Sequence, residues 1–86
     1  MNVDLSYRFI KQLKKTPKEI RQAFQQRTLL FIKNPFHPFL HNHALHGHYE
    51  GKRSINVTGD WRAIYQEVSP HCVMFIALGT HNQLYK

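Results

Sequence analysis

Apolar residues alternate weakly at the start of the chain and then take up helical spacing. Val3 and Leu5 share one side of the first segment, which predicts a short strand over residues 1–5. Ser6 is a favourable N-cap for a helix over residues 7–15. The apolar stripe of that helix consists of Phe9, Ile10 and Leu13.

A second helix is predicted directly after the first. Thr16-Pro17-Lys18-Glu19 has the pattern of a capping box with proline at the first helical position. The helix ends at Asn34-Pro35, because proline cannot continue it. Its apolar positions are Ile20, Ala23, Phe24, Leu30 and Phe31. The two helices form a hairpin, and we expect its exposed side to carry Arg8, Lys11, Lys14, Lys15, Lys18 and Arg21.

The second half of the chain has the pattern of a loop followed by strands. Residues 35–51 hold two prolines, two glycines and five histidines, and are predicted to be a loop. Strands are predicted over residues 52–58, which alternate, and over residues 61–68, with a hairpin turn at Gly59-Asp60. A third strand, residues 72–78, is wholly apolar, as in a buried central strand.

Residues 79–86 are predicted to be a short polar tail with Leu84 and Tyr85 as anchors. The predicted order is therefore β-α-α-β-β-β, in one α+β domain over residues 1–86. We expect the helical hairpin to pack on one face of a small twisted antiparallel sheet. The other face of that sheet is then open for a site.

Charge and composition narrow the classes of function. The 86 residues include 12 Lys and Arg against 5 Asp and Glu, a formal net charge of +7, which favours a polyanionic partner such as nucleic acid, the ribosome or an acidic protein.

The chain is too short for two ordinary domains and too apolar to be disordered. A single cysteine excludes an intramolecular disulfide. Asp4 interrupts any signal peptide and no apolar run could span a bilayer, so we expect a cytoplasmic protein without a membrane partner.

The loop contains four histidines within eight residues: His41, His43, His46 and His48. Imidazole is a common metal ligand, but structural zinc sites usually combine it with closely spaced cysteines. The lone Cys72 falls in a predicted core strand, where packing explains it better than a nucleophilic role. We predict no metal and no cofactor; solvated loop histidines and phosphate contacts remain as the two other interpretations.

A more dispersed set has the groups that metal-free RNA cleavage uses: His43, Asp60, His81 and Tyr85. Such cleavage needs a base for the ribose 2′-OH, an acid for the leaving 5′-oxygen and cations for the developing phosphorane charge. Lys52, Arg53 and Arg62 are candidates for the cations. Taken singly, each residue also has a structural explanation, such as a turn former or a packing residue.

The same residues carry a resemblance to a known family. His43-Ala-Leu-His-Gly, Gly51-Lys-Arg53, Asp60-Trp-Arg-Ala-Ile-Tyr65 and Gly79-Thr-His81 with Leu84-Tyr85 resemble the RelE/ParE superfamily of bacterial toxins. The match is closest to the YafQ-like branch, whose pattern runs H-x-L-x-G, G-x-R, D-W-x-x-I-Y, G-T-H and a late aromatic residue. Length and element order agree over the whole chain.

The resemblance implies a toxin of a type II toxin–antitoxin system that cuts mRNA on the 70S ribosome and is neutralised by a cognate antitoxin. It implies catalytic roles for His43, Asp60, His81 and Tyr85, where Tyr85 replaces a common Phe. The residues expected to contact RNA are Lys52, Arg53, Asn56, Trp61 and Arg62. Trp61 or Tyr85 is a candidate for stacking on a base.

Asn56 departs from the family pattern, which usually has a histidine at this position. Asn can hydrogen-bond a phosphate but cannot exchange a proton near neutral pH. Either His43 and His81 then share the acid and base work, or His46 or His48 contributes, or the enzyme is slow. The Lys/Arg-dominated site of RelE proper is not evident.

Two alternatives come from other classes of function. One is a ParE-like toxin that binds DNA gyrase without nuclease activity, on the same fold. The other is a metal-binding or nucleic-acid-binding module built on the histidine loop. The residue set formed by His43, Asp60 and His81 favours the nuclease over the ParE-like toxin, because a pure binding protein would not need it.

Overall fold

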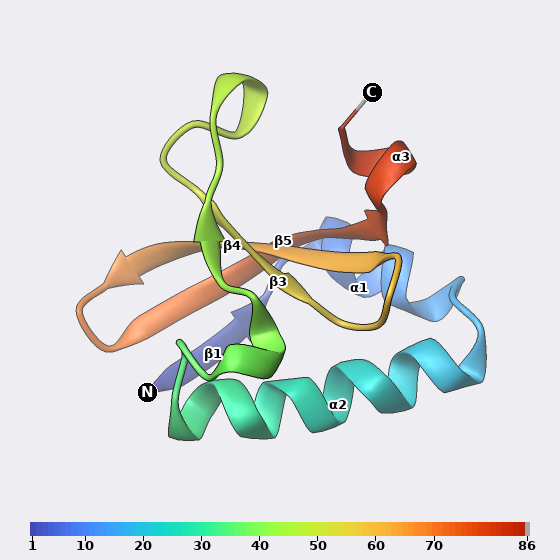
Figure 1. The fold of residues 1–86 in the computed structure, drawn as a ribbon, viewed down its shortest axis with the longest axis horizontal. Coiled ribbons are helices and arrows are strands. Elements are labelled where there is room, and N and C mark those ends of the chain that lie inside the picture. Colours follow the sequence, from blue (N-terminus) through green and yellow to red (C-terminus); the bar gives the residue numbers. More distant parts are fainter. Residues whose placement is uncertain (86) are drawn as a thin grey trace.

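A computed structural model describes residues 1–85 and shows an α+β fold (Figure 1). The strands are β1 (Asn2–Leu5), β2 (His43–Ala44), β3 (Arg53–Asn56), β4 (Trp61–Ser69) and β5 (Cys72–Thr80). The helices are α1 (Tyr7–Lys14), α2 (Lys18–Lys33) and α3 (His81–Leu84), with single 3-10 turns η1 (Pro38–Leu40) and η2 (Gly47–Tyr49). Among these residues, no helix is long and apolar enough to cross a membrane.

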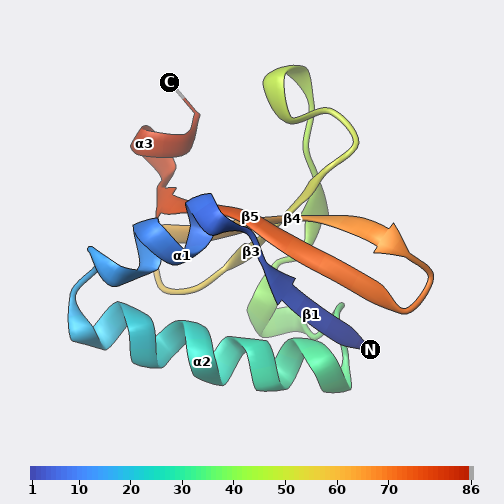
Figure 2. The same ribbon diagram turned by 180° about the vertical axis from the view of Figure 1, so that it is seen from behind.

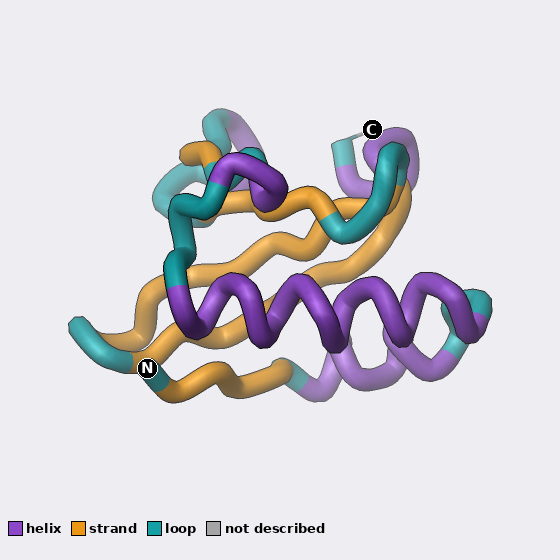
Figure 3. The backbone as a smooth tube through the Cα atoms, turned by 60° about the horizontal axis from the view of Figure 1, so that its bottom comes forward, coloured by secondary structure: helices purple, strands orange, loops and turns teal. Residues whose placement is uncertain are grey.

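The five strands form one sheet in the order β1-β5-β4-β3-β2. Only the β1–β5 pair is parallel, so the sheet is mixed rather than purely antiparallel. The hairpin of α1 and α2 covers one face, as predicted, and α2 runs across it (Figures 2 and 3). The opposite face carries α3 and the segment that joins β2 to β3, here called the arm (residues 45–52), which both rise from the sheet (Figure 1).

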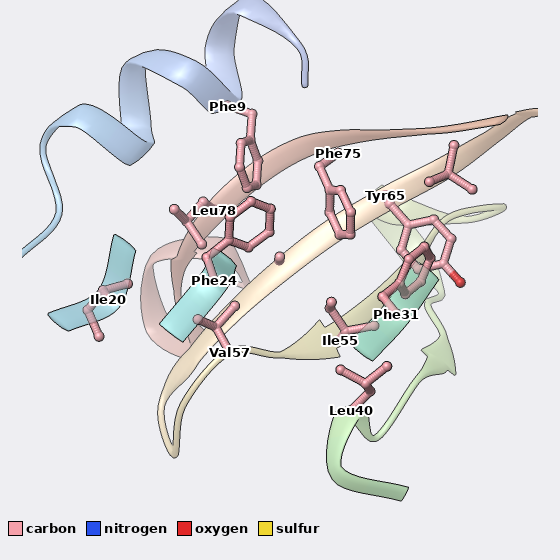
Figure 4. Close-up of a cluster of buried hydrophobic side chains, with 12 residues drawn as sticks. Phe9, Ile20, Phe24, Phe31, Leu40, Ile55, Val57, Tyr65, Phe75 and Leu78 are labelled. Atoms are coloured by element: carbon pink, nitrogen blue, oxygen red, sulfur yellow. The ribbon is translucent and has the colours of Figure 1, made fainter. Parts of the chain in front are cut away.

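An aromatic cluster fills the space between the helices and the sheet (Figure 4). Phe75 of β5 lies at its centre and is fully buried. Its ring centroid is 5.7 Å from that of Phe9, 5.3 Å from Phe24, 5.5 Å from Phe31 and 5.4 Å from Tyr65. One side chain thus joins α1, α2, β4 and β5 through tilted and edge-on ring contacts, which aromatic pairs prefer.

An irregularity in the β4–β5 pairing changes which side chains of β5 face the helices. Ile64 pairs with Ala77 but Tyr65 pairs with Phe75, so Ile76 is an extra residue in β5. A bulge of this kind shifts the alternation of side chains by one position. Ala77 and the residues after it therefore occupy different faces from those that a regular strand would give them.

The predicted N-terminal elements are confirmed, apart from one cap. Ser6 caps α1 by accepting a hydrogen bond from the amide of Phe9 at 3.0 Å. The capping box at Thr16 is wrong: α2 begins after Pro17 without a side-chain cap. The hydroxyl of Thr16 donates instead to the carbonyl of Leu13, at 2.7 Å. That bond ends α1, so the side chain is not available to start α2.

The expected boundaries also change in the second half of the chain. The segment predicted as a loop contains η1, β2 and η2, and β3 is shorter than predicted because residues 57–60 form the connection to β4. The expected polar tail is wrong over residues 79–84. There β5 continues to Thr80, and α3 begins with a capping box in which Thr80 accepts from the amide of Gln83, and Gln83 accepts from that of Thr80.

We expect Phe31→Ala to lower the free energy of unfolding by about 3–5 kcal/mol, since it empties a fully buried site between Tyr65 and Phe75. Leu29→Ala is the matched control on the same helix, at a side chain that is 61% exposed. It should change stability by no more than about 0.5 kcal/mol. Urea unfolding measures both, and equal losses would contradict the assigned core.

Candidate functional site

The open face of the sheet carries a hollow of about 590 Å³ between residues 41–46, here called the foot of the arm, and α3. Five of the sequence-predicted site residues line it, together with four neighbours. The lining residues are His41, His43, Ala44, Leu45, His46, Asn56, Arg62, His81 and Tyr85. The structure thus gathers into one cavity residues that are up to 44 positions apart in the chain, from His41 to Tyr85.

Strand pairing explains why these side chains meet. His43 of β2 pairs with Ser54 of β3, and Asn56 pairs with Arg62 of β4. Directly paired residues of antiparallel strands place their side chains on the same face. Arg62 pairs in turn with Gly79 of β5, so Asn56, Arg62 and Gly79 form one row across the open face.

The ring of His43 is oriented by the backbone. Its Nδ1 lies 2.7 Å from the carbonyl oxygen of His41, which can only accept, so Nδ1 carries the proton and Nε2 of the neutral ring is an acceptor. His41 adopts φ +47°, the left-handed region, at the end of η1. This conformation was not predicted, because positive φ is uncommon in residues other than glycine and no turn pattern marks the position.

Asn42 fixes the foot of the arm and was also missed by the sequence analysis. Its side-chain NH₂ donates to the carbonyl of Pro35 at 2.9 Å and to the hydroxyl of Tyr65 at 2.7 Å. Its carbonyl oxygen accepts from Nε of Arg53 at 2.8 Å. The residue before His43 is therefore tied to a loop, a core tyrosine and β3 at once.

Burial raises the pKa of the Tyr65 hydroxyl, and the hydrogen bond from Asn42 only partly opposes this effect. The phenol therefore stays protonated well above neutral pH, and the link between the core and the foot of the arm involves no charge on Tyr65. Its oxygen can accept the amide proton while its own proton remains in place.

The guanidinium of Arg62 is fixed by the turn between β3 and β4. Its Nη1 shares two N–H donors among the carbonyl oxygens of Thr58, Gly59 and Trp61, at 3.1, 3.0 and 3.2 Å. A guanidinium has five N–H donors in a planar fork, so the donors that Nη1 does not carry remain for a ligand in the hollow. A phosphate oxygen is a suitable acceptor for such a fork.

His81 is positioned by the start of α3 and by the same turn. Its backbone N–H donates to the carbonyl oxygen of Asp60 at 3.1 Å, and its ring centroid is 4.8 Å from that of Tyr85. Asp60 itself is exposed and is not among the lining residues. The connection from Asp60 to the cavity thus runs through its backbone carbonyl.

A small apolar cluster holds the arm and α3 on the sheet. It consists of Leu45, Tyr49, Ile64, Ala77 and Leu84, with Tyr85 and Ile76 against it. Gly79 allows α3 to lie this close, because a Cβ there would be 3.0 Å from Oε1 of Gln83 and 3.3 Å from Cγ of Leu84. Within the described chain, two buried hydroxyls lack a hydrogen-bond partner: those of Ser54 and Tyr85.

The other expected RNA contacts lie outside the cavity. Trp61 is half-buried and packs against the helix-side core. Lys52 and Arg53 line a separate hollow beside Glu50 and Glu67. Of the histidines proposed as alternatives, His46 lines the main cavity, whereas His48 packs edge-on against Tyr49 (4.9 Å between centroids) outside it.

Cys72 is half-buried where β5 pairs with β1, and its Sγ lies 3.5 Å from Oδ2 of Asp4. Burial and the neighbouring carboxylate raise the pKa of this thiol, which disfavours the thiolate that nucleophilic attack requires. Over residues 1–85, the structure contains no cluster of three or more His, Cys, Asp or Glu side chains arranged to hold a metal ion.

Comparison with known proteins decides the family. Residues 2–86 match the family described as "Bacterial toxin of type II toxin-antitoxin system, YafQ". The chain belongs to the YafQ family. As a YafQ-family protein it is a toxin of the type II class, and the predicted resemblance is confirmed. No curated protein matches the sequence at a significant level.

Solved structures of YafQ share this fold. YafQ from E. coli strain BL21(DE3) is 25% identical, with a TM-score of 0.82, over 99% of this chain and 98% of that one. YafQ in the E. coli DinJ-YafQ toxin-antitoxin complex is 25% identical, with a TM-score of 0.79 over 99% and 97%. The YoeB/ParE toxin from Agrobacterium tumefaciens, at 16% identity and a TM-score of 0.77 over 94% and 99%, shares the fold.

We expect Asn42→Ala to lower the free energy of unfolding by about 1–3 kcal/mol, because three hydrogen bonds at the foot of the arm are lost. Amide exchange should accelerate at Leu45, whose N–H bonds the carbonyl of Lys52 across the arm. The control is Tyr65→Phe, which removes only one of the three bonds. Equal effects of the two variants would show that the bonds to Pro35 and Arg53 contribute nothing.

Tyr85→Phe should leave the free energy of unfolding unchanged or raise it by up to about 1 kcal/mol, because the deleted hydroxyl is buried without a partner. Tyr85→Leu removes the ring contacts with His81 and Tyr49 and should be destabilising. Thermal unfolding of the two variants is the measurement. A clear loss of stability in Tyr85→Phe would mean that the hydroxyl has a partner after all.

Proposed function

We propose that this YafQ-family toxin is an endoribonuclease that cuts mRNA on the 70S ribosome, without a metal ion, and thereby inhibits translation. The observation that carries the proposal is the shared cavity of His43, Arg62 and His81. It combines two imidazoles with a fixed guanidinium, which are the groups that a base, an acid and a phosphate-binding cation require.

His43 is the base in this proposal. The Nδ1–H bond to the carbonyl of His41 leaves Nε2 as the ring's acceptor, and Nε2 takes the proton of the ribose 2′-OH. The 2′-oxygen then attacks phosphorus, and the bond from phosphorus to the 5′-oxygen breaks. His81 donates a proton to the leaving 5′-oxygen. Two histidines suffice for this exchange, so Asn56 need not transfer a proton.

Arg62 and Asn56 hold the phosphate. Nη1 of Arg62 is already bound to three carbonyl oxygens, so the guanidinium need not be reoriented as negative charge develops on the phosphorane. Asn56, its neighbour across the β3–β4 pair, supplies a neutral donor beside it. Tyr85 supports the ring of His81 and is a positioning residue here, because its hydroxyl is buried.

The partners proposed are a cognate antitoxin, the ribosome and mRNA. The DinJ-YafQ complex has the same fold on its toxin side, which supports an antitoxin for this chain. The exposed basic side of the helical hairpin includes Arg8, Lys11 and Lys15 and fits rRNA phosphates. An acidic antitoxin would complement the same net charge of +7.

We expect His81→Ala and His43→Ala each to lower the rate of mRNA cleavage at least about 100-fold, the usual contribution of a positioned acid or base. The measurement is the mapping of mRNA 5′ ends in a reconstituted translation reaction, with and without ribosomes. The matched control is His71→Ala, an exposed histidine at the β4–β5 turn, which should cut like the wild type. A 2′-deoxy sugar at the cut position should block cleavage.

Unchanged cleavage by a folded His81→Ala chain would overturn the role of His81. Intact mRNA in every reaction, with loss of gyrase supercoiling activity, would instead indicate the ParE-like function. Loss of cleavage on adding a zinc-selective chelator, with magnesium kept constant for the ribosome, would contradict the metal-independent mechanism.

A further inference from the structure

The geometry points to a second RNA contact, resting on the proposed function: Phe36 and Phe39 form a stacking platform for unpaired bases of the strand whose scissile phosphate occupies the cavity. The platform lies on the segment between α2 and β2, on the helix side of the sheet, whereas the cavity lies on the open face (Figure 1). None of its rings lines the cavity itself.

Both rings are largely open to solvent. Phe36 is 64% exposed and Phe39 is 66% exposed, although a phenylalanine ring gains free energy when it is buried. The nearby Leu40 is fully buried in the core and anchors the segment. The two rings are therefore exposed on a segment that is anchored in the core, not on a flexible loop.

Hydrogen bonds hold both phenylalanines in place. The amide N–H of Phe36 donates to Oδ1 of Asn34 at 3.1 Å, and that of Phe39 donates to Nδ1 of His37 at 3.1 Å. The backbone of His37 donates to the carbonyl of Asn34, also at 3.1 Å. These bonds fix the backbone of the segment, so little backbone conformational entropy is lost when a base stacks on the rings.

Each ring lies against an arginine. The guanidinium carbon of Arg53 is 5.3 Å from the centroid of Phe36, and that of Arg27 is 5.9 Å from the centroid of Phe39. His37 adds an edge-on ring 4.8 Å from Phe39. Aromatic faces interleaved with cations are typical of surfaces that bind single strands, where bases stack on the rings and phosphates meet the cations.

The platform is connected to the cavity through two residues. His41 ends η1 directly after Phe39 and Leu40, and it also lines the cavity. Arg53 contacts Phe36 and donates to Asn42, the residue before His43. An RNA strand with its scissile phosphate at Arg62 would reach the platform by passing around β2, the edge strand of the sheet. This assigns RNA contact to Arg53 at the platform, outside the cavity.

The test compares binding of a fluorescent single-stranded RNA of roughly 12 nucleotides to variants of the full chain. All carry His81→Ala, so that the RNA is not cut. Phe36→Leu/Phe39→Leu keeps the exposed apolar surface but removes the aromatic faces, and should weaken binding roughly 10- to 100-fold. Phe36→Trp/Phe39→Trp should retain the affinity, and its tryptophan fluorescence should be quenched by the RNA.

The matched control is Val68→Ala, an exposed apolar side chain on β4, which should bind RNA like the parent chain. Unchanged affinity in the double-leucine variant overturns the proposal. If that variant instead binds a polyglutamate peptide more weakly while RNA binding is unchanged, the patch serves an acidic protein and the proposal also fails.

Cleavage assays separate this inference from the proposed function. A chain with His81 intact and both leucines should cut the same mRNA positions with a lower kcat/KM. If that chain has a normal kcat/KM and its cleavage still depends on His81, the platform is contradicted and the nuclease function stands. If RNA binding depends on the two rings but no mRNA is cut, the nuclease function is contradicted and the platform stands.

Discussion

The packing of Phe75 against four other aromatic rings is the contact on which the rest of the molecule depends. It joins both long helices to the middle of the sheet, and one of its partners, Tyr65, continues the connection to the open face. The hydroxyl of Tyr65 accepts from Asn42, and the backbone after Asn42 carries His43. The position of a proposed catalytic ring is thus set by the same aromatic cluster that stabilises the domain, through Tyr65 of that cluster and Asn42.

The open face has its own, smaller cluster, and the site lies between the two segments that this cluster holds. Leu45 and Tyr49 of the arm meet Leu84 of α3 above Ile64 and Ala77 of the sheet. Ala77 faces this side because of the bulge at Ile76. Neither the arm nor α3 would be stable alone, since each is too short to bury an apolar face of its own. Their mutual packing is what turns a bare sheet surface into a cavity.

The sequence predicted the helices and strands whose apolar residues recur at helical or strand spacing. We predicted α2 correctly from the stripe of Ile20, Phe24 and Phe31, and β5 from the apolar run of residues 72–78. Both patterns follow directly from which side chains the element buries. The caps were less predictable, since Thr16-x-x-Glu19 and Thr80-x-x-Gln83 have similar patterns but only the second forms a capping box. The hydroxyl of Thr16 is taken by a carbonyl that the pattern does not include.

The sequence predicted five of the residues that line the cavity, but not their geometry, because the orientation of their side chains depends on backbone carbonyls that only the folded turns bring into place. His43 and Arg62 each use a nitrogen to bind the protein's own backbone, and this leaves the remaining nitrogens directed by the fold. Arg53 is likewise oriented by the protein, through the hydrogen bond from its Nε to the side-chain oxygen of Asn42. Groups anchored in this way need little reorganisation when a phosphate arrives, which is the main source of electrostatic stabilisation in enzymes. A site with Asn56 in place of a third histidine depends all the more on that preorganisation, since it has fewer groups that exchange protons.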